Sequence, residues 1–136
     1  MPRLYRDAPL NSIWEGSGNV QALDVLRALR REPGSLDAFL AEVAEAAGAD
    51  RRLDEAVTGL KEHLTERDDP EGQARRVVER MALVLQGSLL VRHSPAYVAD
   101  AFCASRLAGD HGLALGTLPA GLDSAAIVER ATPALP

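Results

Sequence analysis

The residues best suited to chemistry lie close together between Asn11 and Val20. The carboxylate of Glu15 stands beside the indole of Trp14 and directly before the triplet Gly16-Ser17-Gly18. Glycines let a backbone approach a bound molecule closely. An apolar ring beside a carboxyl group favours the neutral form of that carboxyl group. The pKa of the group then rises toward the range in which a carboxylate works as a general base. Glu15 is therefore a candidate general base.

The same triplet also has an ordinary structural explanation. A predicted helix starts at Asn19, and serine, asparagine and glycine are common where a helix begins. A helix N-terminus also binds phosphate and other anions, so a ligand there is consistent with the pattern too. The dinucleotide-binding fingerprint is not met, because a third glycine is missing and no strand precedes the segment. From the residues alone, capping and ligand binding both remain open.

Apolar residues recur at spacings of three and four from Asn19 onward, which predicts amphipathic helices, the first ending at Pro33-Gly34. The longest predicted helix has Val77, Val84 and Leu89 among its inward positions and is expected to be the most buried. Capping residues and prolines predict five more helices. Two of them follow capping residues, one after Asp50 and a short one after Asp123. The other three are predicted to run from Ser35 to Gly48, from Pro70 to about Arg92, and from Pro95 to Gly109.

Composition also indicates an all-α fold. Aromatic residues make up only 4% of the 136 residues, and the apolar set is dominated by alanine and leucine, which lose little entropy in a helix. No stretch alternates apolar and polar residues as a half-buried strand does. We expect an antiparallel helical bundle of about five to six helices, without a sheet, over residues 19–136. Residues 1–18 are expected to be a connector that carries the start of the Glu15 segment.

The net charge and the cysteine content limit the binding partners and the cellular compartment that the sequence is compatible with. A formal net charge of −5 argues against a dedicated nucleic-acid binder, although Arg75, Arg76 and Arg80 gather on the longest predicted helix. The single cysteine, Cys103, fits a reducing compartment. No signal peptide and no apolar run long enough for a membrane span are evident. We expect a soluble, cytoplasmic protein with no membrane partner, and no metal site because the three histidines are dispersed.

One stretch resembles the segment around the catalytic glutamate of the acyl-CoA dehydrogenases: Ile13-Trp14-Glu15-Gly16-Ser17-Gly18-Asn19-Val20, continued by Leu23-Asp24-Val25-Leu26-Arg27. With Leu4-Tyr5-Arg6 and Pro9-Leu10-Asn11-Ser12, it is most similar to the AidB-like, alkylation-response branch of that family. The later helices are similar in character to the C-terminal helical extension of that branch. The resemblance therefore covers the whole chain and is most specific from Tyr5 to Arg27.

The resemblance implies a role for each matching residue. Glu15 matches the base that removes the α-proton of an acyl-CoA thioester while hydride passes to FAD. The stretch of Gly16, Ser17 and Asn19 matches the segment that contacts the flavin. Trp14 stands where the wider family more often has tyrosine, and Ser17 where it more often has threonine. Arg27 matches an arginine at the end of the motif, with a role that is either structural or in lining the site.

The length of the chain departs from this family. Such an enzyme encloses its flavin with an N-terminal helical domain and a central β-domain, which this sequence lacks. We therefore expect a C-terminal fragment that is inactive alone, because the cofactor carries the chemistry. Its partners would be those domains, if separately encoded, and uncovered apolar surface predicts self-association. The alternative is a stand-alone helical interaction module that binds a partner protein or, less favoured, DNA.

Overall fold

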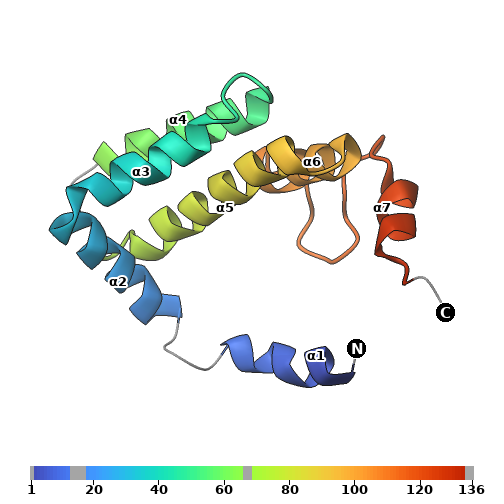
Figure 1. Cartoon of the computed structure of the whole chain (residues 1–136), viewed down its shortest axis with the longest axis horizontal. Coiled ribbons are helices and arrows are strands. Elements are labelled where there is room, and N and C mark those ends of the chain that lie inside the picture. The colour runs from blue at the N-terminus through green and yellow to red at the C-terminus, as the bar shows by residue number, and fades with distance from the viewer. Residues whose placement is uncertain (1, 13–17, 66–68, 134–136) are drawn as a thin grey trace.

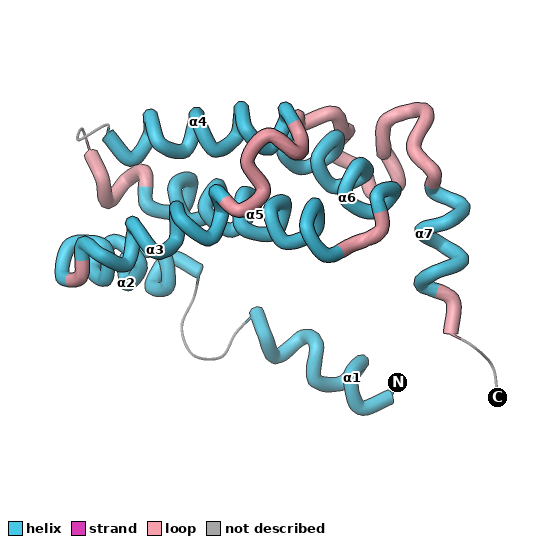
Figure 2. Tube along the Cα trace, turned by 45° about the horizontal axis from the view of Figure 1, so that its top comes forward, coloured by secondary structure: helices cyan, strands magenta, loops and turns pink. Residues whose placement is uncertain are grey.

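The structure is a computed structural model that describes residues 2–12, 18–65 and 69–133 (Figure 1). The all-α class is confirmed, because these ranges contain helices, turns and loops but no strand (Figure 2). None of the described helices is both long enough and apolar enough to cross a membrane. The elements in chain order are α1 (Pro2–Asp7), η1 (Ala8–Ser12), α2 (Gly18–Arg31), α3 (Pro33–Ala44), α4 (Arg51–Thr65), α5 (Ala74–His93), α6 (Ala96–Phe102), η2 (Cys103–Leu107) and α7 (Ser124–Ala131).

Helix α5 is the centre of the bundle, as predicted for the longest helix. It packs against α2, α3, α4, α6 and η2, and Figure 1 shows α4 running antiparallel beside it. Val77 and Val84 are buried on its inner side. Ser88 is also fully buried, and its hydroxyl donates a hydrogen bond to the carbonyl of Val43 at 3.2 Å. The core therefore reaches from α5 to the end of α3 without an unsatisfied serine at this point.

Gly87 allows the closest approach to α5. A Cβ atom built on this glycine would lie 2.9 Å from Leu107 Cδ1 and 3.2 Å from Leu53 Cδ1. Leu53 belongs to α4 and Leu107 to η2, so both elements meet α5 at one backbone position. A larger residue would force the Leu107 and Leu53 side chains to shift, because 2.9 Å is closer than two carbon atoms approach in a packed core.

An ionic network ties the start of α4 to α6. Asp50 caps α4 by accepting a hydrogen bond from the backbone N–H of Arg52 at 2.8 Å, which confirms this predicted cap. The Arg52 guanidinium then bridges Asp50 at 2.6 Å and Asp100 at 2.8 Å. The Arg52 hydrogen bonds lower the pKa of Asp50, and Asp50 in turn raises the pKa of Arg52. Burial beside this network raises the pKa of the Cys103 thiol to about 11.

Three predicted features differ in the structure. Ser35 does not cap the second bundle helix, because α3 already begins at Pro33, whose ring is tolerated in a first turn. Helix α5 begins at Ala74 rather than at Pro70, because Asp69 adopts a left-handed backbone (φ 51°) and its side chain closes a turn on the Gly72 N–H at 3.1 Å. Leu89 is 39% exposed rather than inward. By contrast, Asp123 caps α7 as predicted, accepting from the Ala126 N–H at 3.0 Å.

Residues 2–12 lie within the predicted connector and are themselves helical. Both views show α1 and η1 apart from helices α2 to α6 (Figures 1 and 2). The side chains from Pro2 to Leu10 are exposed, including Leu4 (68%) and Tyr5 (82%). The division into a connector and a bundle at residue 18 stays a prediction.

Replacing two helical glycines by alanine tests the close approach at Gly87. Alanine is better than glycine in a helix interior by about 0.5–1 kcal/mol. At Gly59 of α4 a Cβ meets no atom within 4 Å, so Gly59→Ala is expected to raise the urea midpoint. At Gly87 the overlap with Leu107 and Leu53 outweighs that gain, and Gly87→Ala is expected to destabilise by about 1–3 kcal/mol. Equal effects of the two substitutions in urea unfolding would contradict the packing described.

The Asp50 network predicts a loss of stability in acid. The folded state lowers the pKa of Asp50 below the ordinary carboxyl value of 3.8. The ionised carboxylate therefore contributes to the free energy of unfolding above pH 3.8, and this contribution is lost as the pH falls below that value. We expect the free energy of unfolding to drop below about pH 4, and the drop to shrink in Asp50→Asn. Asp37→Asn, at an exposed position of α3, is the matched control and should keep the wild-type pH profile. Superimposable profiles for wild type and Asp50→Asn would overturn this role.

Candidate functional site

Most of the predicted catalytic segment lies outside the described residues. These are Trp14, Glu15, Gly16 and Ser17, and their roles stay predictions. The described part of the motif starts with Gly18, the first residue of α2, followed by Asn19 in the first turn with its side chain exposed. The described helix thus begins one residue before the predicted start at Asn19, with the last glycine of the triplet in its first turn.

A hollow of about 370 Å³ opens where α2 begins. Gly18 and Ala22 line it from α2, and Arg75, Arg76 and Glu79 line it from α5. A Cβ atom built on Gly18 would lie 3.8 Å from Arg75 Nη2, so this guanidinium lies beside the first residue of the helix. The packing of α2 on α5 thus brings two arginines to the end of the glutamate motif.

The electrostatics of this hollow favour an anion. The first turn of a helix has N–H groups without helical partners and carries the positive end of the helix dipole. Within the described part of the chain, neither Arg75 nor Arg76 forms an ion pair, and Glu79 is the one acidic residue in the lining. Guanidinium groups bind phosphate through paired N–H donors. The donor set therefore suits a phosphate or a similar anionic group.

Arg27 lies away from this lining. Its Nη1 atom is 2.7 Å from Asp24 Oδ1, and the two side chains are 58% and 56% exposed. An exposed pair at this helical spacing contributes at most about 0.5 kcal/mol. The structure thus gives Arg27 a local contact within α2, and its predicted alternatives, structural or lining the site, stay open.

The sequence did not reveal that Arg75 and Arg76 lie beside the motif. Arg75 has Glu71 and Glu79 four residues away on either side, a spacing that predicts intrahelical ion pairs. Among the described residues neither pair forms, and Glu71 lies in the turn before α5 rather than in the helix. Helical periodicity shows which face of α5 is polar, but not which helix that face meets.

Comparison with known proteins agrees with the motif. The chain is 39% identical to the Escherichia coli (strain K12) protein "Putative acyl-CoA dehydrogenase AidB" over 76% of this chain. It is 31% identical to "Acyl-CoA dehydrogenase family member 11" of Caenorhabditis elegans over 69% of this chain. The matches cover 19% and 18% of those proteins, so the chain spans about a fifth of the length of the curated relatives it matches. No protein-family model matches it. The chain is thus homologous to one part of AidB-like acyl-CoA dehydrogenases.

Proposed function

We propose that this chain supplies the general-base segment and one side of the flavin site of an AidB-like, FAD-dependent acyl-CoA dehydrogenase. The observation that carries the proposal is the cationic hollow at Gly18, which follows the Glu15 segment directly along the chain. The relationship to acyl-CoA dehydrogenases adds support from outside the structure. The parent activity is the oxidation of a CH–CH bond, and the chain alone is proposed to be inactive because it spans about a fifth of such a protein.

In the proposed reaction, the Glu15 carboxylate takes the proton from the α-carbon of an acyl-CoA thioester. When bound, FAD supplies the acceptor for the hydride that leaves the β-carbon. The electron pair left at the α-carbon then forms the α,β double bond, so one proton and one hydride leave the substrate. Trp14 would lie beside the base, where an apolar ring keeps its proton affinity high.

The residues around Gly18 fit the anionic part of a flavin nucleotide. The α2 N-terminus with Asn19 and the guanidinium of Arg75 would hold a phosphate oxygen there. Gly16 and Ser17 would add close backbone contact and a hydroxyl donor, as the family resemblance implies. The N-terminal and β-domains of an acyl-CoA dehydrogenase would supply the opposite wall. The single cysteine favours the cytoplasm as the compartment.

The role of Glu15 is tested in a hybrid that joins this chain to the remaining domains of an AidB-like relative. Glu15→Gln removes the base but keeps size and hydrogen bonding. We expect flavin to stay bound and the reduction of the flavin by an acyl-CoA substrate to fall by at least about 100-fold, the usual contribution of a positioned base. Glu45→Gln, at an exposed end of α3, is the matched control and should keep full activity. Equal turnover in Glu15→Gln and wild type would remove Glu15 from this role.

The alternative, a stand-alone interaction module, is favoured by one surface feature. Leu113 and Leu115 are fully exposed, at 105% and 103%, in the loop after η2. Thr117 braces this loop, accepting from the Gly112 N–H at 2.9 Å and donating to the Ala114 carbonyl at 2.7 Å. A braced loop that presents two leucines is suited to contact another apolar surface.

This loop predicts the self-association of the isolated chain. Replacing Leu113 and Leu115 together by serine removes the exposed apolar surface without touching the core. We expect the mass measured by light scattering at increasing concentration to rise for wild type and to stay monomeric for the double variant. Ala114→Ser, between the two leucines, is the matched control and should associate like wild type. A wild-type chain that remains monomeric at every concentration would contradict the prediction.

A further inference from the structure

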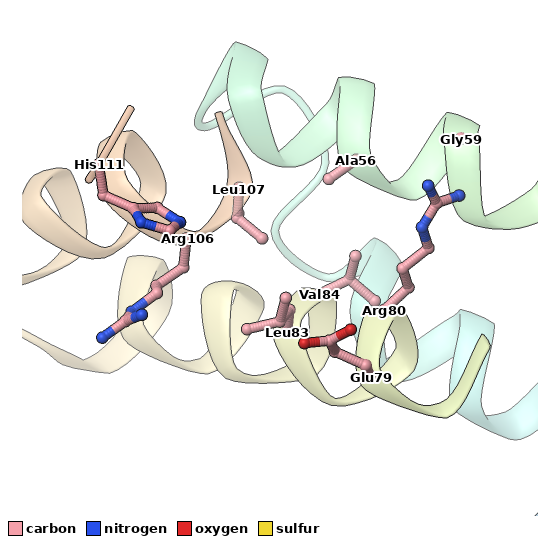
Figure 3. A pocket seen from close by; sticks show the side chains of 9 residues that line it. All are labelled: Ala56, Gly59, Glu79, Arg80, Leu83, Val84, Arg106, Leu107 and His111. Atoms are coloured by element: carbon pink, nitrogen blue, oxygen red, sulfur yellow. The ribbon is translucent and has the colours of Figure 1, made fainter. Parts of the chain in front are cut away.

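A second hollow, of about 500 Å³, lies on another side of α5, between α4 and η2 (Figure 3). This volume falls within the usual range for sites that bind small molecules, about 300–1,000 Å³. Leu83 and Val84 of α5 and Leu107 of η2 converge at its centre, and Ala56 faces them from α4. The floor of the hollow is therefore an apolar strip formed by three helical elements.

Two arginines flank this strip. Figure 3 shows Arg80 reaching toward Gly59 of α4 at one end, and Arg106 with His111 at the other. Glu79 is the one acidic residue among those that line the hollow. A strip of alkyl side chains between guanidinium groups matches a molecule with an apolar body and an anionic head.

The charges of both arginines are left without a carboxylate in the described part of the chain. Arg80 Nη1 lies 2.6 Å from His63 Nδ1. The same ring nitrogen lies 3.2 Å from the Gly59 carbonyl oxygen, so the contact of Arg80 in this structure is with an imidazole beside a backbone carbonyl on α4 and not with a carboxylate. Arg106 is exposed and forms no ion pair with any described residue. Each guanidinium thus keeps N–H donors available for an anion.

The backbone at this end of the hollow is also unusual. Residues Cys103–Leu107 form a π-helix, with the Ala108 N–H bonded to the Cys103 carbonyl at 2.9 Å. The wider turn inserts a residue relative to an α-helix, and such turns are frequent at functional sites. Here it presents Leu107 to Gly87 and places the adjacent Arg106 at the rim of the hollow.

We propose that the hollow between α4, α5 and η2 binds a small amphipathic anion, a carboxylate or phosphate monoester on a short aliphatic body. The body lies on Leu83, Val84 and Leu107, and the head is held by Arg106 or Arg80. None of the described residues that line this hollow belongs to the start of α2, so the proposal can fail without affecting the dehydrogenase role, and the reverse.

Isothermal titration of the full chain with octanoate and octyl phosphate tests this site. Octanol has the aliphatic body without a charged head, whereas acetate and inorganic phosphate have a charged head without a long aliphatic body. Their affinities therefore measure the contributions of the two parts separately. We expect saturable binding of at least one amphipathic anion, and binding at least about tenfold weaker for the uncharged alcohol and for the heads alone, since a charge-assisted hydrogen bond contributes about a factor of ten or more. Whichever amphipathic anion binds more tightly identifies the head as carboxylate or phosphate.

Variants then locate the bound molecule. Arg106→Gln and Arg80→Gln are expected to weaken binding, by about tenfold or more for the arginine that holds the head. Arg30→Gln, an exposed arginine of α2 outside this lining, is the matched control. Gly59→Leu places a side chain on the α4 wall, where a Cβ meets no atom, and is expected to block the hollow while the helical circular-dichroism spectrum is kept.

Several results would overturn the proposal. The first is the absence of saturable binding. A second is octanol binding as tightly as the anions, and a third is an equal loss of affinity in Arg30→Gln and Arg106→Gln. Abolition of binding by the Leu113 and Leu115 double variant alone would place the molecule on the exposed loop instead.

Discussion

The closeness of three helices at Gly87 is the constraint on which the rest of the bundle depends. Because this residue has no side chain, Leu53 of α4 and Leu107 of η2 both reach the backbone of α5. Their contact sets the distance of α4 and η2 from α5. The Arg52 bridge to Asp50 and Asp100 joins the start of α4 to α6, the helix directly before η2. Apolar packing and a partly buried ionic network thus both hold α4 to the α6–η2 segment.

Helix α5 connects the two hollows of the molecule. Its first turns bring Arg75 and Arg76 to the start of α2, where the glutamate motif ends. One turn later, Arg80, Leu83 and Val84 face α4 and η2. Glu79 lines both hollows, so neighbouring faces of one helix serve both sites. The same buried helix that organises the core therefore also places the cationic groups.

Much of the fold could be predicted from the sequence, because helical periodicity and caps are local signals. Asp50 and Asp123 cap helices as expected, whereas Ser35 and Pro70 carried equally plausible signals that the chain does not use as predicted. At Pro70, the left-handed Asp69 turn competed with helix initiation. The site was less predictable. The motif identified Glu15 through its resemblance to a family, but the approach of Arg75 to Gly18 depends on how α2 and α5 pack, which no local pattern encodes.

The visible absorption spectrum after incubation with FAD and desalting tests most directly whether this chain forms one side of a flavin site. It should be recorded for the chain alone and for the chain joined to the remaining domains of an AidB-like relative. We predict that the isolated chain is colourless after desalting, because one side of a binding site does not enclose a flavin. The joined protein is predicted to retain the yellow cofactor. A joined protein that folds but emerges colourless would contradict the assignment.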